Sequence, residues 1–276
     1  MSQVAVQTLL QTTAVTIRDV ACDGSCRHRS DEECSSATHL VFPYRGLFLR
    51  HLGRDDAVAE ANQVLFFNGD DGYRISHPVA GGDACLSFAI DAALLHELAP
   101  PHQLRTGPAV AFRHQRLRID PRAQALVALL RHSLNRGVAE ILEAETLALT
   151  LVRRSLGERT AHAAAASAGR QKLADRTKLV LSSDLTRRWT LNEIATAVGV
   201  SPVYLTQVFQ QVEGLPLYRY HLRLRLARAL DLLGDYDDLT ALGLDLGFSS
   251  HSHFTAAFRQ VYHCTPAEFQ RSIRAR

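Results

Sequence analysis

The sequence lacks the segments that would place it in a membrane or send it out of the cell. No run of about 18 apolar residues is present, which excludes a membrane-spanning helix. The first residues, MSQVAVQTLLQTTAVTIRD, have neither the basic start nor the long apolar region of a signal peptide. We therefore expect a cytoplasmic protein with no membrane partner, whose five cysteines are thiols or metal ligands rather than disulfides.

Sequence signatures of common enzymes are also absent. The chain contains no nucleophile elbow, no phosphate-binding loop and no dinucleotide-binding fingerprint. We therefore expect that the protein is not an enzyme, and that its function is one of binding.

The last hundred residues contain one helix-turn-helix pattern twice. From residue 191 the chain reads LNEIATAVGVSPVYLTQVFQQVEGLPLYRY, and from residue 239 it reads LTALGLDLGFSSHSHFTAAFRQVYHCTPAEF. In the first copy an apolar-periodic helix ends at Gly199, and a second helix begins with Ser201 as N-cap and Pro202 as first helical residue. In the second copy Gly247 lies in the turn, and Ser249 or Ser250 is the expected N-cap.

The second helix of each copy has an apolar face and a polar face. The apolar positions recur at helical spacing and predict core residues: Leu205, Val208, Phe209 and Val212, then Phe254, Phe258 and Val261. The polar faces carry side chains that can hydrogen-bond to base edges or phosphates, and no carboxylate that would repel DNA. The residues expected to contact bases are Tyr204, Thr206, Gln207 and Gln210 in the first copy and His251, Ser252, Thr255 and Arg259 in the second.

The segment from about residue 173 to 269 resembles the DNA-binding domain of the AraC/XylS family of transcriptional regulators. The resemblance is closest in GFSSHSHFTAAFRQVYHCTPAEF, where Pro266 opens the closing helix. The first copy departs from the family, because Gly214-Leu215-Pro216-Leu217 replaces Gly-x-Thr-Pro. The resemblance implies seven helices, with a long one at about 216–233 joining the two motifs. It also implies double-stranded DNA and RNA polymerase as partners.

Composition divides the chain into two domains. The segment GERTAHAAAASAG, which begins at Gly157, lacks large apolar residues, so we expect a linker at 158–170 between domains at 1–157 and 171–276. From Arg170 onward there are 14 Lys and Arg residues against 10 Asp and Glu residues. This basic excess lies in the part expected to bind DNA.

Residues 4 to about 95 have the pattern of an antiparallel β domain. Turn clusters such as GRDD and NGDDG separate short β-rich runs at 14–20, 40–42, 46–51, 63–67, 73–76 and 85–90. This spacing indicates a barrel or sandwich. Phe67-Asn68-Gly69 and Ser76-His77-Pro78 resemble the second half of a cupin-like barrel, which AraC/XylS regulators commonly contain. The predicted fold class is therefore α+β, with a cupin-like antiparallel β-barrel and two flanking helices before the all-α seven-helix domain with two helix-turn-helix motifs.

The tract at 121–156 predicts the two flanking helices, separated at Gly137. Each has an apolar stripe, formed by Leu126, Leu129, Leu130 and Leu134 in the first and by Ile141, Leu142, Leu149 and Val152 in the second. We expect these helices to pack on the β domain. Because regulators of the family often dimerise through such helices, we also expect a homodimer.

Histidine spacing disfavours a catalytic cupin. Catalytic cupins bind metal through a His-x-His pair, a Glu and a later His, whereas His28, His39, His51 and His77 each stand alone. A cupin-type metalloenzyme is therefore the least favoured interpretation.

Cysteine is the unusual feature of the first half of the chain. Three cysteines lie in the polar segment CDGSCRHRSDEEC and a fourth begins a predicted strand. Such thiolates can form a tetrahedral Zn²⁺ site. The predicted ligands are Cys22, Cys26, Cys34 and Cys85, with His28 or His77 as substitutes.

Three kinds of signal therefore remain open for the N-terminal domain. The first is a zinc–thiolate site that senses the metal ion, with a purely structural zinc site as its alternative. The second is a thiol-based redox sensor. The third is a response to a small-molecule effector by a domain whose cysteines are only structural. In each case we expect a transcriptional regulator that inserts two recognition helices into successive major grooves.

Overall fold

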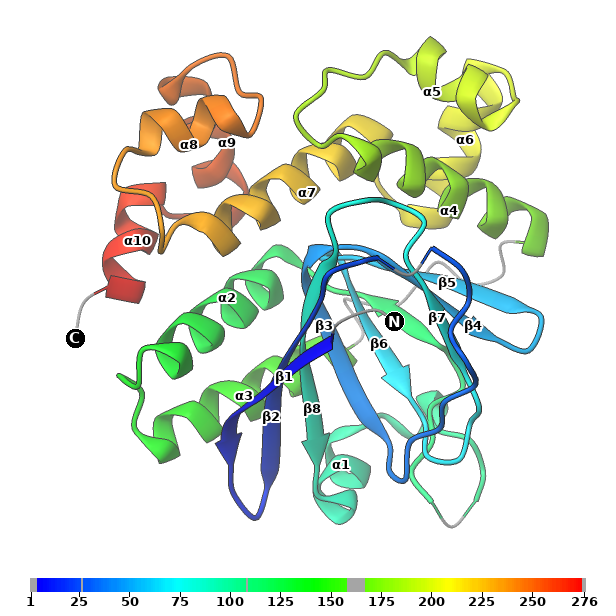
Figure 1. Ribbon diagram of the computed structural model, residues 1–276, viewed down its shortest axis with the longest axis vertical. Coiled ribbons are helices and arrows are strands. Elements are labelled where there is room, and N and C mark those ends of the chain that lie inside the picture. The colour runs from blue at the N-terminus through cyan, green and yellow to red at the C-terminus, as the bar shows by residue number, and fades with distance from the viewer. Residues whose placement is uncertain (1–3, 26, 108, 158–166, 275–276) are drawn as a thin grey trace. The chain divides into compact units, whose positions relative to one another are not determined.

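A computed structural model describes residues 4–25, 27–107, 109–157 and 167–274 of the chain (Figure 1). These residues form two compact units, 4–157 and 167–274. None of the described helices is long and apolar enough to cross a membrane. Of the linker expected at 158–170, residues 158–166 lie outside the described residues. Its last residues belong to a helix instead, because Ser167 is an N-cap and Ala168 opens the helix.

The strands of the first unit form two antiparallel sheets. The larger has the order β1 (Val4–Gln11), β2 (Val15–Cys22), β8 (Asp83–Ile90), β3 (His39–Gly46), β6 (Gln63–Phe67) and β9 (Arg116–Arg118). The smaller has the order β5 (Asp55–Ala59), β4 (Phe48–Leu52) and β7 (Arg74–Ser76). The antiparallel β domain is thus confirmed, although the strands divide between two sheets. The cupin-like identity of the domain stays a prediction.

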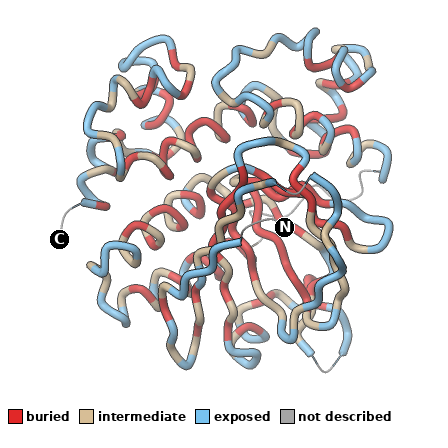
Figure 2. The backbone as a smooth tube through the Cα atoms, in the orientation of Figure 1, coloured by how far each residue is buried: buried red, intermediate tan, exposed pale blue. Residues whose placement is uncertain are grey.

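The central strands of the larger sheet are buried on both faces. Successive side chains of a strand point to opposite faces, and each face packs in a core of its own. In β3, Leu40 and Phe42 join the core formed with the helices of the unit. Val41, between them, joins a second core with Phe48 of β4 and Phe67 of β6. Figure 2 shows the resulting concentration of buried residues along these strands.

Helices complete the first unit. They are α1 (Ala92–Leu98), the 3-10 helix η1 (Pro101–Gln103), α2 (Pro121–Asn135) and α3 (Ile141–Leu156). The prediction of two helices separated at Gly137 is confirmed, and Gly137 has a φ of 64°. Val127 and Leu130 of α2 and Leu151 of α3 belong to the core between the larger sheet and the helices. One face of each helix therefore covers that sheet.

Helices alone form the described part of the second unit. They are α4 (Ala168–Ser183), α5 (Leu191–Val198), α6 (Pro202–Glu213), α7 (Leu217–Leu232), α8 (Leu239–Asp245), α9 (His251–Tyr262) and α10 (Pro266–Arg274). The predicted caps are confirmed. Gly199 ends α5 with a φ of 73°, and the Ser201 hydroxyl accepts from the Tyr204 N–H. Of the two candidate serines, Ser250 caps α9.

A buried ion pair joins the first and third helices of this unit. Lys178 of α4 lies 2.7 Å from Glu213 at the end of α6, and both side chains are fully buried. Around them, Leu181, Phe209 and Tyr220 belong to one apolar core. Because either charge alone would be costly to bury, the pair requires that α4 and α6 pack together.

Gly247 allows a close contact within the second unit. Its φ is 78°, and a Cβ at this position would lie 2.2 Å from the carbonyl oxygen of Thr186. Gly199 has a similar φ, but a Cβ there would meet nothing within 4 Å. The two turn glycines therefore differ in packing and not in backbone conformation.

We predict that Gly247→Ala destabilises the second unit more than Gly199→Ala. The Gly199 substitution should cost about 1–2 kcal/mol, the usual penalty for a left-handed residue with a Cβ. The Gly247 substitution adds a steric clash with backbone. Urea unfolding followed by the fluorescence of Trp189, the only tryptophan of the chain, measures both changes. Equal losses of stability would contradict the close contact.

Candidate functional site

Helix α6 presents an exposed face opposite its buried side. Tyr204 is 46% exposed, and Gln207 and Gln210 are also exposed. Thr206 is half-buried, and its hydroxyl donates to the Pro202 carbonyl at 2.9 Å, so the hydroxyl is engaged within its own helix. Val203, which the sequence interpretation did not select, is 69% exposed. An exposed valine on such a face can contact a thymine methyl group.

Helix α9 presents the corresponding face in the second motif. His251, Ser252 and Arg259 are exposed, and Thr255 is half-buried with its hydroxyl 3.3 Å from the His251 ring. These four residues line one shallow surface depression together with Ala256, Gln260 and Thr265. The residues predicted for this helix thus share one accessible surface.

Arg225 of α7 ties the two motifs together. Its guanidinium donates to the Leu185 carbonyl at 2.5 Å, the Thr186 carbonyl at 2.7 Å and the Arg187 carbonyl at 3.1 Å. It also reaches the Gly247 carbonyl, in the turn before α9, at 3.5 Å. One side chain therefore bonds the segment before α5 and the turn between α8 and α9.

His221 lies one helical turn before Arg225 and contacts the same segment. Its Nε2 atom is 3.1 Å from the Leu185 carbonyl oxygen. Burial, together with the nearby Arg225 charge, lowers the pKa of His221 to about 4. The imidazole is therefore neutral at pH 7 and donates a hydrogen bond without adding a charge.

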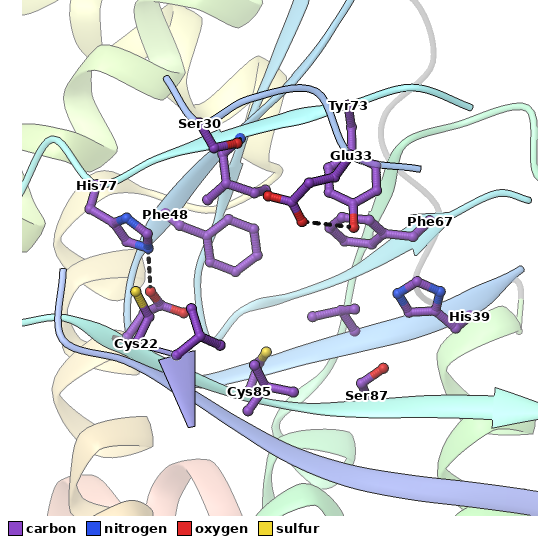
Figure 3. A pocket seen from close by; sticks show the side chains of 15 residues that line it. Cys22, Ser30, Glu33, His39, Phe48, Phe67, Tyr73, His77, Cys85 and Ser87 are labelled. Atoms are coloured by element: carbon purple, nitrogen blue, oxygen red, sulfur yellow. Dashed lines mark hydrogen bonds and ion pairs between the residues drawn. The ribbon is translucent and has the colours of Figure 1, made fainter. Parts of the chain in front are cut away.

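The first unit contains a cavity of about 290 Å³ between its two sheets (Figure 3). Its walls are largely apolar and include Val20, Val41, Phe48, Phe67 and Ile75. The segment before β3 contributes to the wall as well. There Glu33 and Tyr73 exchange two backbone hydrogen bonds of 2.8 Å, and the Tyr73 hydroxyl lies 3.4 Å from the Glu33 carboxylate. The cavity can hold a small, mostly apolar molecule.

Polar side chains gather at one end of this cavity. The Nε2 atom of His77 is 2.7 Å from Asp83 Oδ1, and the Cys22 thiol lies beside them. Ligand atoms of the three residues all lie within 4.8 Å of one another. Figure 3 shows Cys22 and His77 facing each other. At the far side of the cavity His39 stacks on Phe67 with ring centroids 5.1 Å apart, and burial lowers the pKa of His39.

The structure separates most of the predicted zinc ligands. Among the described residues, the group of ligand atoms that lies close together includes Cys22 and His77 but not Cys34, Cys85 or His28. Cys34 is exposed, whereas Cys85 is 6% exposed and burial raises the pKa of its thiol. Cys26 lies outside the described residues. Asp83, which joins the group, is not among the ligands predicted from the sequence.

Comparisons with known proteins identify the second unit. The model of the family described as "Helix-turn-helix domain" matches residues 194–272. A solved transcriptional regulator from Chromobacterium violaceum, titled as having an AraC-type DNA-binding domain, is 31% identical. The match covers 40% of this chain and 98% of the chain of that regulator, with a TM-score of 0.37. The second unit is an AraC-type helix-turn-helix domain.

Relatives differ in how much of the chain they match. The regulatory protein PocR of Salmonella typhimurium is 33% identical over 94 residues, which are 34% of this chain and 30% of PocR. The chain therefore spans less than a third of the length of PocR. The probable transcriptional regulator LumQ of Photobacterium leiognathi is 26% identical over 248 residues, 87% of this chain and 94% of LumQ.

The lowered pKa of His221 predicts a pH-dependent stability of the AraC-type domain. The unfolded imidazole, with an ordinary value of 6.5, binds a proton before the folded one does. Stability should therefore fall as the pH drops from 6.5 to about 4, by at most about 3 kcal/mol, and His221 should add no further loss below that.

Urea unfolding monitored by Trp189 fluorescence between pH 7.5 and about 4 tests this dependence. His221→Gln should remove most of the change in the free energy of unfolding with pH above pH 5. The carboxylates of the domain contribute little to that change above pH 5. His251→Gln, the same change at an exposed histidine, should preserve it. An unchanged slope in His221→Gln would assign the dependence to other groups.

Burial predicts unequal reactivity of the N-terminal cysteines. Cys34 should react with iodoacetamide in the native protein because it is exposed, and Cys85 should react only after unfolding. Peptide mass spectrometry after timed labelling measures both rates. Labelling of Cys85 as fast as Cys34 in native protein would contradict its burial.

Proposed function

We propose that the protein is a sequence-specific DNA-binding transcriptional regulator whose N-terminal unit senses an effector. The observation that carries this proposal is the pair of accessible polar faces on α6 and α9, held on one AraC-type domain. Helices of this kind read base edges in the major groove, while backbone amides and basic side chains contact phosphates. The proposed function is one of binding and regulation, not catalysis.

Arg259 is the strongest candidate for a base contact. It is exposed on α9, and a guanidinium can donate two hydrogen bonds to the O6 and N7 atoms of one guanine. Tyr204, Gln207 and Gln210 of α6 are accessible for the corresponding role in a second groove segment. The half-buried Thr206 and Thr255 are better suited to apolar contact through their methyl groups, because their hydroxyls have partners in their own helices.

The cavity of the N-terminal unit supports effector binding. It lies between the two sheets, is partly open to solvent, and combines apolar walls with a few polar groups, which is the usual composition of a small-molecule site. An effector that binds one state of the unit more tightly would shift DNA binding through a coupling free energy of about 1–3 kcal/mol. We further propose that the regulator acts as a homodimer and contacts RNA polymerase.

Thiol oxidation is a less favourable signal. A sensor thiol needs exposure and a low pKa, whereas Cys85 is buried and its pKa is raised. Cys34 is exposed, and among the described residues no cysteine forms a disulfide with it. An effector bound in the cavity is therefore better supported than oxidation of Cys85, whereas Cys26 lies outside the described residues.

We predict that Arg259→Ala weakens specific DNA binding by about 1–3 kcal/mol, the usual loss for one bidentate base contact. The assay is fluorescence anisotropy with a duplex that the unaltered protein has selected from a random library. Arg176→Ala, the same change at an exposed arginine of α4, should leave the affinity close to that of the unaltered protein. Equal affinities for Arg259→Ala and the unaltered protein would remove Arg259 from the interface.

A further inference from the structure

Strand pairing brings Cys22 and Asp83 together. Cys22 ends β2, Asp83 begins β8, and the two residues are direct cross-strand partners. Side chains at paired positions lie on the same face of a sheet. The segment after β7 brings His77 to the same point, where its ring contacts Asp83. Residues far apart in the sequence thus provide one sulfur, one nitrogen and one oxygen ligand.

We propose that Cys22, His77 and Asp83 form a site for a divalent transition-metal ion, with one coordination position open to the N-terminal cavity. Zn²⁺ suits this donor set best, because thiolate, imidazole and carboxylate are its ordinary protein ligands. The proposal deepens the sensing part of the proposed function and rests on it for its biological meaning. It names the site at which an effector binds.

The spacing of the three side chains fits a metal ion after a small adjustment. Ligand atoms on a tetrahedral zinc ion are about 3.4 Å apart, as follows from bond lengths of about 2.0–2.3 Å. The ligand atoms here lie within 4.8 Å of one another, and the His77–Asp83 pair is at 2.7 Å. A metal ion would replace the hydrogen bond between His77 and Asp83 with a bond to each of them.

Charge also favours a bound ion at this place. His77 and Asp83 are each 6% exposed, and Cys22 is half-buried. Metal binding releases the thiol proton, so the ligands of the occupied site include a thiolate and a carboxylate. A divalent cation balances those two negative charges, and the neutral imidazole adds none, so the complete site has no net charge.

The backbone around the site is closely packed. Gly82 has a φ of 69°, and a Cβ there would lie 2.2 Å from the carbonyl oxygen of Cys22. Gly24 packs against Gly82 so closely that its Cβ would lie 2.7 Å from the Gly82 Cα. The chain after Cys22 and the chain before Asp83 therefore hold each other in place, as expected for a preorganised site.

The open position defines the chemical class of the effector. All three ligands line the cavity, so a metal ion bound by them is accessible from it. Three protein ligands leave one position of a tetrahedral ion for water or an added ligand, whereas purely structural zinc sites have four protein ligands. The apolar walls, including Val41 and Phe48, fit the body of a small molecule whose carboxylate or thiolate binds the metal.

Metal content and Co²⁺ spectroscopy of the full-length protein, purified without a histidine tag, test the site. We expect about one zinc ion per chain by elemental mass spectrometry. We also expect Co²⁺ to give a tetrahedral spectrum with a band from a single thiolate. Cys22→Ser and His77→Gln should each weaken Co²⁺ binding by more than about 100-fold, beyond the 10–100-fold range for residues that only support a ligand.

Matched variants separate this site from the thiolate site predicted from the sequence. Cys34→Ser and Cys85→Ser make the same change at thiols outside the group and should retain the metal. Cys26→Ser should retain it as well. Loss of metal in any of these three variants, or full metal binding by Cys22→Ser, would overturn the proposed ligands. Circular dichroism of each variant checks that a loss of metal is not a loss of folding.

Azide tests the open position because it is small enough to reach an accessible metal ion. Azide should change the spectrum of the Co²⁺ protein, and an unchanged spectrum would mean that the position is closed. Protein that contains no metal after purification and binds no Co²⁺ would overturn the site altogether. DNA binding is measured separately on the same samples, so a failed metal site and a failed DNA-binding function give different results.

Discussion

The arrangement of the AraC-type domain depends on the hydrogen bonds of one guanidinium. Arg225 binds three successive carbonyl groups before α5 and a fourth in the turn before α9. A planar guanidinium spreads five fixed donors over three nitrogen atoms and so suits acceptors on two segments better than an ammonium group, whose three donors share one atom. His221 and Gly247 complete the contact, the first by a neutral hydrogen bond and the second by its lack of a side chain. The segment before α5 and the turn before α9 are thereby tied to the same residue of α7.

A different constraint organises the N-terminal unit, namely the position of β8 between β2 and β3. Because β8 is buried on both faces, its alternate residues serve different purposes. Leu86 and Phe88 belong to the core between the larger sheet and the helices, whereas Asp83 and Cys85 line the cavity. The strand that contributes to the core of the unit therefore also lines its cavity.

Local signals explain which features the sequence could predict. The N-caps, the turn glycine at 199 and the helical spacing of Leu205 and Phe209 are properties of short segments, and the structure confirms them. Thiol chemistry and the grouping of three cysteines in one segment predict the zinc ligands, but pairing between β2 and β8 decides which residues meet. No sequence signal marks Asp83 as a ligand, because only strand pairing brings it beside Cys22. The division of the strands into two sheets likewise depends on pairings between distant segments.

The buried pair of Lys178 and Glu213 affects how the AraC-type domain can be divided. The family match begins at residue 194, after α4 has ended. A chain cut at that point would keep Glu213 and lose Lys178, leaving a carboxylate in the apolar core without its counter-ion. The core of the domain therefore includes a helix that lies before the matched residues. A domain that includes α4 keeps the ion pair between α4 and α6 intact.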